Sequence, residues 1–314
     1  MGGGMVLPAC PVLAMHGIAR DATPHMMSFM NMLDAAAFER LLASSPPFVS
    51  LERALTGHGV ALTIDDAIRG AADAALLARR LGHQVTLFVN PGQVESGVPY
   101  AWLTLAAMLD KVRGRTMSFD GTPHPIRTLA ERHRLRREIR RRLCDMKSEP
   151  ERQALVRALG REWKVTDIEF HPHTTMLTRH DLVALRDAGV DIQNHGFWHH
   201  EHRSLTGAES AANLHDGRRW LEREIGVDAR YFAAPFGEAL PPADESIACD
   251  AWFTLTTELP SGWNTRPVFN RETLDIPNMP RAFPRRLTAI RRWVSRLVGA
   301  WRPETAPPAS TRSG

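Results

Sequence analysis

Cysteine is scarce in this chain of 314 residues, which contains only Cys10, Cys144 and Cys249. The three lie far apart and are odd in number, which excludes a disulfide framework and the paired cysteine knuckles of a zinc ribbon. Any metal ion in this protein is therefore held by histidine and carboxylate side chains.

Long apolar runs are also lacking. No window reaches the ~20 apolar residues that span a bilayer, and the first residues lack the basic segment of a secretory signal. Hydrophobic residues make up 43% of the chain and charged residues 24%, as in an ordinary globular protein. We expect a cytoplasmic protein without a membrane-spanning helix.

Lysine is nearly absent as well, with 3 residues among 39 basic ones, and the charge of the arginines is local. Residues 127–147 and residues 285–302 each carry a net charge of +6, which leaves −8 for the rest of a chain whose total is +4. A nucleic-acid binder more often spreads arginines over a reading surface with aromatic platforms. We therefore expect no nucleic-acid partner.

Short apolar or β-branched runs alternate with helical patterns along the chain. The strand candidates are 11–15, 48–51, 60–64, 85–89, 190–193, 231–234 and 252–256. The helix candidates are 36–42, 68–81, 178–188 and 208–225. Thr178 and Asp181 form an approximate capping box. The alternation predicts an α/β fold, a distorted (β/α) barrel of about seven parallel strands.

Three segments depart from this alternation. Residues 101–163 are helical and Arg-rich without a strand signal, which predicts a helical insertion in a barrel formed by residues 1–284. Residues 285–302 predict a basic amphipathic helix, either docked on the barrel or lying on an anionic membrane surface. Residues 303–314 predict a disordered tail.

Two adjacent carboxylates, Asp65 and Asp66, follow the apolar run 60–64. Neighbouring side chains of a strand point to opposite faces, so two carboxylates converge only where the strand gives way to a loop. Barrel enzymes keep their catalytic residues at that end of the strands. The other interpretation, that the pair only caps the following helix, is equally compatible with the pattern.

Four of the 14 histidines lie between residues 195 and 202, directly after the strand candidate 190–193. His195 and His199 are four residues apart, a spacing that lets two imidazoles share one metal ion. The density of the cluster favours ligands over isolated structural histidines. For His200 and His202 we expect supporting or surface positions.

Residues 231–237, YFAAPFG, end a strand candidate with the rigid turn Pro235, Phe236 and Gly237. Backbone N–H groups of such a turn can point into a barrel mouth, although a plain strand-to-loop turn explains the segment equally well by itself.

Together these segments resemble the polysaccharide deacetylase family, the NodB-homology metal-dependent carbohydrate esterases. The family motif TFDDG is similar to TIDDA at 63–67, and H(S/T)xxH matches HGFWH at 195–199. The motif near FRPPYG resembles FAAPFG at 232–237. The likeness runs from about residue 10 to residue 284.

A further likeness involves the segment VLAMHG at residues 12–17. It resembles the opening of a permuted group of the family, in which the motif that carries the acid histidine lies at the amino terminus. His16 is the matching residue.

This resemblance implies a TIM-like barrel enzyme that removes an N-acetyl group from an N-acetylated sugar in a glycan or lipid-linked saccharide. The implied ligands of a divalent metal, expected to be zinc, are Asp66, His195 and His199. Asp65 would be the general base and His16 would protonate the departing amine. The metal and a backbone N–H near Phe236 would stabilise the oxyanion.

The sequence also departs from the family pattern. The arginine of the third motif, which orients the base, is replaced by Ala233, so the partner of Asp65 is not identified. Ile64 and Ala67 replace the Phe and Gly of TFDDG. For the tryptophan of the fourth motif, Trp252 and Trp263 are candidates.

Two other functions fit the same motifs. One is removal of a formyl group from a lipid-linked aminosugar, and the other is a metal-free carbohydrate-binding relic of the fold. In each case the partner is a carbohydrate. Residues 285–302 add a possible anionic membrane surface, which would place the protein at the inner face of the membrane.

Overall fold

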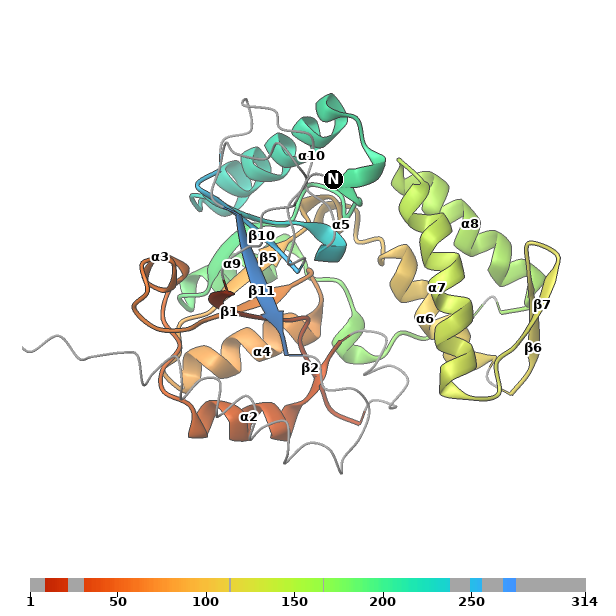
Figure 1. Cartoon of the computed structure of the whole chain (residues 1–314), viewed down its shortest axis with the longest axis horizontal. Coiled ribbons are helices and arrows are strands. Elements are labelled where there is room, and N and C mark those ends of the chain that lie inside the picture. The colour runs from red at the N-terminus through yellow and green to blue at the C-terminus, as the bar shows by residue number, and fades with distance from the viewer. Residues whose placement is uncertain are drawn as a thin grey trace, which may run out of the picture.

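The computed structural model describes residues 9–21, 31–112, 114–165, 167–237, 249–255 and 268–274. Seven parallel strands form a closed ring in the order β1-β11-β10-β9-β8-β5-β4. Figure 1 labels β1, β11, β10 and β5 of this ring. They are β1 (Ala9–Met15), β4 (Ala61–Asp65), β5 (Thr86–Val89), β8 (Asp191–Asn194), β9 (Tyr231–Ala233), β10 (Ala251–Thr254) and β11 (Val268–Thr273). The predicted barrel of seven parallel strands is confirmed.

The first strand closes the ring, because β1 pairs with β4 on one side and with the last strand, β11, on the other. The pairing is thinnest between β8 and β9, where Asn194 opposite Phe232 is the one registered pair. Since all seven strands run the same way, their carboxyl ends meet at one mouth of the barrel. Asp65 and Asn194 are the last residues of β4 and β8 and reach that mouth.

Helices cover the outside of the ring and bury a continuous apolar cluster against it. They are α2 (Ala35–Ser44), α3 (Leu51–Leu55), α4 (Arg69–Arg80), α5 (Pro91–Ser96), α9 (Arg179–Asp187) and α10 (Gly207–Trp220), which continues as η3 (Leu221–Ile225). Two-residue strands β2 (Ile18–Ala19) and β3 (Leu33–Asp34) pair beside them. The capping box predicted for α9 is present, because Thr178 Oγ1 accepts from Asp181 N and the Asp181 carboxylate accepts from Thr178 N.

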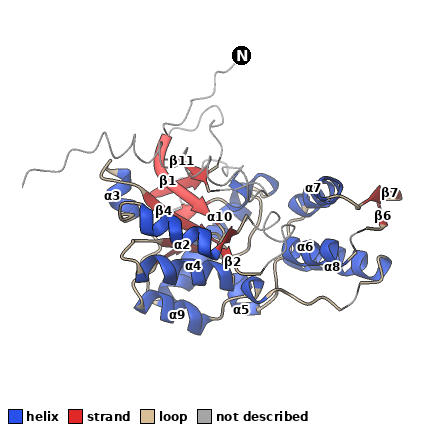
Figure 2. Cartoon of the chain, turned by 90° about the horizontal axis from the view of Figure 1, so that it is seen from below, coloured by secondary structure: helices blue, strands red, loops and turns tan. Residues whose placement is uncertain are grey.

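Between β5 and β8 the chain leaves the ring and builds a second body beside it, clearest in Figure 2. This body contains α6 (Ala101–Lys111), β6 (Thr116–Phe119), β7 (Thr122–Pro125), α7 (Leu129–Asp145) and α8 (Glu149–Glu162). Leu105, Leu135 and Ile139 belong to an apolar cluster whose members all lie between residues 101 and 168. We refer to residues 101–163 as the insertion.

Three expectations about strands were wrong. The insertion contains a hairpin, β6–β7, whose turn residues Asp120 and Gly121 have φ of 49° and 74°. Residues 48–51 do not form a strand, because Ser50 caps α3 by accepting a hydrogen bond from Arg53 N. Strand β11 was not anticipated.

Several predictions fall outside the described residues: the helix 285–302, the tail 303–314 and Trp263. Among the helices that are described, none has the length and apolar character needed to cross a membrane.

Candidate active site

A cavity of about 210 Å³ opens at the carboxyl ends of the strands. It is lined by His16, Asn31, Asp65, Asp66, Trp102, Arg136, Arg140, His195, His199, Ala234, Phe236, Gly237 and Leu255. Of the residues predicted from the motifs, Pro235 alone is missing from this lining. The structure thus gathers residues up to 239 positions apart, from His16 to Leu255, around one cavity.

The turn after β4 lets both carboxylates reach this cavity. Asp65 ends the strand, and Asp66 adopts the left-handed backbone region with φ of 76°. That conformation is uncommon for a residue with a Cβ, although Asp tolerates it better than most. It breaks the alternation of side chains that would otherwise point the two carboxylates apart.

Asp66, His195 and His199 form a buried group with the geometry of a metal site. One ligand atom from each lies within 4.8 Å of the others. Oδ1 of Asp66 is 3.9 Å from Nε2 of His195 and 3.5 Å from Nε2 of His199. Three protein ligands in this arrangement leave a fourth position open, as in catalytic zinc sites.

The carboxylate of Asp66 supplies a test of whether a cation fits. Both of its oxygens are buried and lack a hydrogen-bond partner within the described residues. Burial and the neighbouring charge of Asp65 raise the pKa of Asp66 well above its usual value. Burying an ionised carboxylate without hydrogen-bond donors is unfavourable in free energy unless a cation compensates its charge. These residues therefore fit a divalent metal.

His195 is held in the orientation that a ligand needs. Its Nδ1 lies 2.7 Å from the carbonyl oxygen of Ala233, so Nδ1 carries the proton and Nε2 faces Asp66. Burial lowers its pKa to about 4, against the opposing charge of Asp65. The imidazole is therefore neutral near pH 7, which is the form that coordinates metals.

A hydrogen-bond chain ties the two ligand-bearing loops together. Asn90 Nδ2 donates to the carbonyl of His195 at 2.6 Å, and Tyr100 Oη donates to Asn90 Oδ1 at 2.9 Å. The same hydroxyl accepts from Ala67 N at 3.0 Å, one residue beyond Asp66. Asn90 and Tyr100 are 0% and 1% exposed, so this chain fixes the spacing between Asp66 and His195 without solvent.

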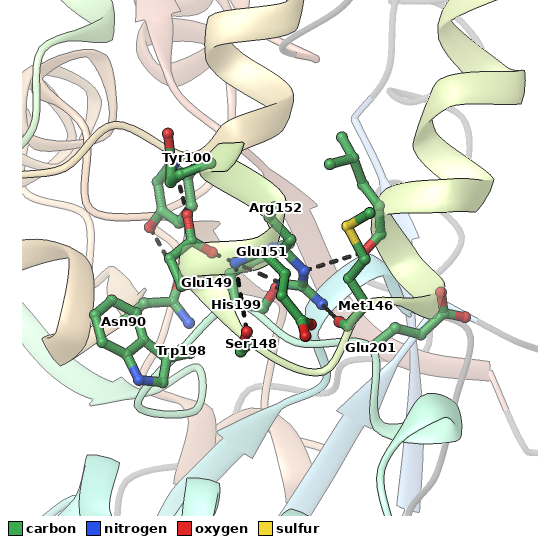
Figure 3. A network of polar contacts seen from close by, with 12 residues as sticks. Asn90, Tyr100, Met146, Ser148, Glu149, Glu151, Arg152, Trp198, His199 and Glu201 are labelled. Carbon is green, nitrogen blue, oxygen red and sulfur yellow. Dashed lines mark hydrogen bonds and ion pairs between the residues drawn. The ribbon is translucent and has the colours of Figure 1, made fainter. Parts of the chain in front are cut away.

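The loop that carries His199 is anchored from the insertion. Arg152 of α8 donates to the carbonyls of Leu143, Met146 and His199, at 3.0, 2.9 and 2.7 Å (Figure 3). Its side chain is buried, and the contact to His199 joins the insertion to the barrel mouth. The sequence analysis missed this role, because an arginine within an Arg-rich helix carries no distinguishing pattern.

The two remaining histidines of the cluster lie apart from the metal group. His200 and His202 are buried, so the surface position considered for them was wrong and the supporting position describes them. His202 Nδ1 lies 2.6 Å from Ser210 Oγ, which ties the loop to α10. Neither shares the Asp66 group.

Asp65 has an arginine partner that the sequence did not reveal. Arg271 of β11 makes a two-pronged ion pair, with Nη1 and Nη2 each 2.7 Å from one carboxylate oxygen, and Nη1 also donates to Thr63 Oγ1. Burial is the largest single influence and would raise the pKa of Asp65, but the charge and hydrogen bonds of Arg271 together with the charges of His195 and His16 outweigh it and lower the pKa to about 2. Arg271 is thus the partner of Asp65 that could not be identified from the sequence.

His16 follows β1 and lines the cavity with Asp65. Its Nδ1 is buried without a hydrogen-bond partner in the described part of the chain. Burial lowers its pKa, Asp65 opposes this, and Arg271, Arg136 and Arg140 add to the lowering.

Aromatic side chains shape the rest of the wall. The ring of Phe236, at a turn with φ of 61°, lies 4.5 Å from the ring of His199, centroid to centroid. Trp102 stacks on Tyr100 at 5.1 Å and also lines the cavity. Trp252 is buried against Phe232 and is absent from the lining, which removes it as a candidate for a cavity tryptophan.

Comparisons with known proteins bear on the family and the fold of the chain. The family model described as polysaccharide deacetylase matches residues 52–248. The solved structure of the Streptococcus pyogenes deacetylase PplD in complex with acetate is similar in fold, with a TM-score of 0.52 at 14% identity over 91% of this chain and 99% of that one. IcaB from Ammonifex degensii gives a TM-score of 0.49 at 16% identity over 92% and 97%. The search of curated proteins returned no match.

Proposed function

The chain belongs to the polysaccharide deacetylase family, and from this premise we propose that it is a metal-dependent hydrolase that removes the N-acetyl group from an N-acetylated sugar in a glycan or lipid-linked saccharide. One observation carries the proposal: the buried group Asp66, His195 and His199 shares a cavity with Asp65, whose charge is held by Arg271. A relic of the fold would have no reason to keep such a group.

Asp66, His195 and His199 would hold the metal, for which zinc is the expected ion because two neutral imidazoles and a carboxylate suit it. When bound, a divalent cation polarises an acyl oxygen and makes water acidic enough to attack near neutral pH. The remaining steps depend on the side chains of the chain itself.

Asp65 accepts the proton of the attacking water, while Arg271 keeps its carboxylate ionised and oriented. His16 lies in the same cavity; because its pKa is lowered, it would first receive the proton that Asp65 takes from the water and then donate it to the departing amine. This role makes the amino-terminal strand part of the catalytic ring, as in the permuted group.

The turn 235–237 offers one donor to the oxyanion. Pro235 has no N–H, and the N–H of Gly237 already donates to the carbonyl of Ala234 at 3.1 Å. The N–H of Phe236 is therefore the member of the turn that would stabilise the negative charge.

The test measures acetate and free amine released from an N-acetylated oligosaccharide by purified, zinc-loaded protein, with the N-formylated sugar as a matched substrate. We expect acetate release that stops in His199→Ala, which binds no metal, and continues in His58→Ala, a substitution of an exposed histidine. Faster release of formate would support the deformylase instead. A wild-type protein that binds no zinc and releases neither acid would exclude both.

The cellular location is part of this proposal. A cytoplasmic enzyme acting on a lipid-linked saccharide would benefit from contact with the membrane, and each basic residue near an anionic surface contributes about 1 kcal/mol. We expect the protein to float with phosphatidylserine vesicles but not with phosphatidylcholine vesicles. Replacing the six arginines of 285–302 with glutamine tests this segment, and unchanged flotation would show that another surface binds the lipid.

A further inference from the structure

The insertion contributes two arginines to the wall of the catalytic cavity. Arg136 and Arg140 lie one turn apart on α7, a spacing that places side chains on the same face of a helix. Both line the cavity that holds the metal group, and both lower the pKa of His16. Their positive charge thus acts at the site where a substrate would bind.

The carboxylates that line the cavity, Asp65 and Asp66, are engaged elsewhere. Asp65 is neutralised by its ion pair with Arg271, and Asp66 serves the metal. The guanidinium of Arg140 lies 4.8 Å from the centroid of the Phe236 ring, and none of the ion pairs found among the described residues involves Arg140. A bound divalent cation would make the cavity more positive still.

Holding two like charges together is unfavourable for the protein alone. Burial and the charges of Arg140 and Arg137 lower the pKa of Arg136 to about 10. A ligand that brings negative charge between the two guanidinium groups relieves this repulsion, and a phosphate group fits because its oxygens match the forked donors of arginine.

We propose that Arg136 and Arg140 bind a phosphate group of the substrate, so that the enzyme acts on an N-acylated sugar that carries a phosphate. This inference rests on the proposed function, for which it names the substrate class. Trp102 lies on the same wall and offers a ring face to the sugar, and its buried Nε1–H has no acceptor within the described residues.

The kinetic test compares three substrates: methyl N-acetylglucosaminide, N-acetylglucosamine 1-phosphate and a prenyl-diphosphate-linked N-acetylglucosamine. We expect kcat/KM to be at least about tenfold higher for a phosphate-bearing sugar, since hydrogen bonds to charged groups are strong. The preference should disappear in Arg136→Gln/Arg140→Gln and persist in Arg141→Gln, which removes an exposed charge from the same helix. Faster hydrolysis of N-acetylglucosamine 1-phosphate would identify a soluble substrate, and faster hydrolysis of the prenyl-diphosphate-linked sugar would identify a lipid-linked one.

A binding measurement separates this inference from the proposed function. Titration calorimetry with inorganic phosphate on the zinc-loaded protein should show affinity at least about tenfold weaker in the double variant than in Arg141→Gln, because phosphate contact with the metal is common to both proteins. Equal affinities, or equal kcat/KM for the charged and uncharged sugars, overturn the subsite. If no sugar is hydrolysed, the proposed function fails. The phosphate affinities of the double variant and of Arg141→Gln then test the subsite by themselves.

Discussion

At the scale of single residues, the ion pair between Asp65 and Arg271 is the least replaceable contact in the cavity. Both side chains are almost fully buried, and both carboxylate oxygens are used by the guanidinium. Removing one partner of such a pair leaves an uncompensated buried charge, which typically costs about 3–5 kcal/mol. Arg271 therefore sets both the position and the charge of the Asp65 carboxylate.

Asp65→Asn keeps the size of the side chain but removes its ability to accept a proton. We expect the variant to retain a full complement of zinc and to lose about 10²- to 10⁴-fold in kcat, the usual contribution of a general base. Metal analysis and steady-state kinetics on the same preparation check this. A rate close to that of the wild type would exclude Asp65 as the base.

Arg271→Met should raise the pKa of Asp65, because burial, which opposes the charge, remains while the compensating cation is gone. With Arg271 present, the pKa of Asp65 in the folded protein is about 2, below the ordinary aspartate value of 3.8. The pair therefore stabilises the fold above pH 3.8 and loses this effect as the pH falls towards 2. In the variant, the acid limb of the kcat/KM profile should move to higher pH.

Arg271→Lys is the matched control, since it keeps the positive charge but not the two-pronged contact. The acid limb of the kcat/KM profile of Arg271→Lys should lie closer to that of the wild type than the limb of Arg271→Met does. A variant of Arg271 that lowers only the melting temperature, with an unchanged pH profile, would show that this arginine is structural and does not position the base.

The contrast between Arg271 and the metal group shows what the sequence could predict. His195 and His199 are four residues apart, and Asp65 and Asp66 are adjacent. Their spacing in the sequence was therefore enough to predict them as candidate site residues. Arg271 is 206 positions from Asp65, in a short strand with Asn, Arg and Glu in its sequence. No local pattern marks a partner that only ring closure brings near.

At the scale of secondary-structure elements, the insertion and the barrel meet through polar contacts and through Leu103 and Trp102 of α6, which pack with the apolar cluster of the barrel. Arg152 of α8 holds the loop of His199, and Arg140 of α7 covers Phe236. The metal site therefore depends on helices that belong to neither the ring nor its outer layer.

Arg152→Met should loosen this loop, because the carbonyls of Leu143, Met146 and His199 lose a donor in a buried place. An unsatisfied buried polar group costs about 1–3 kcal/mol, so we expect lower stability to urea and at least about tenfold weaker zinc affinity. Chelator competition measures the affinity. Arg157→Met, a substitution of an exposed residue on the same helix, should change neither the stability to urea nor the zinc affinity. Unchanged zinc affinity in Arg152→Met would refute the anchoring role.

The elements that sequence reasoning missed have local causes. The hairpin β6–β7 had a signal, the Asp120-Gly121 pair whose positive φ values suit a tight turn, but its strands contain Pro123 and Pro125. Residues 48–51 have β-forming side chains, and a single cap at Ser50 was enough to begin a helix. Short elements are decided by such contacts rather than by periodicity.

At the scale of the whole molecule, the described chain has one apolar cluster mainly in the barrel, which also includes Leu103 of α6, and a second cluster confined to residues 101–168. Each cluster excludes water from its own set of side chains. The two bodies can therefore lose structure at different free energies, although the cavity needs both.

Ile139→Ala removes a fully buried side chain from the cluster of the insertion and should cost about 2–5 kcal/mol there. Hydrogen exchange should accelerate in α6, α7 and α8 while the ring strands stay protected, and turnover should fall because α7 and α8 support the cavity. Ile192→Ala, in the barrel cluster, should give the opposite pattern of protection. Uniform acceleration in both variants would mean that the two bodies unfold as one unit.

Ring closure between β1 and β11 also sets a timetable for biosynthesis. Synthesis at about 5–20 residues per second separates the appearance of Asp65 on the ribosome from that of Arg271 by roughly 10–40 s. During that interval β1 can find β4, while its other edge and the carboxylate of Asp65 both lack their partners. A nascent chain interrupted before β11 would thus carry an open sheet edge prone to pairing with other chains, and no competent base.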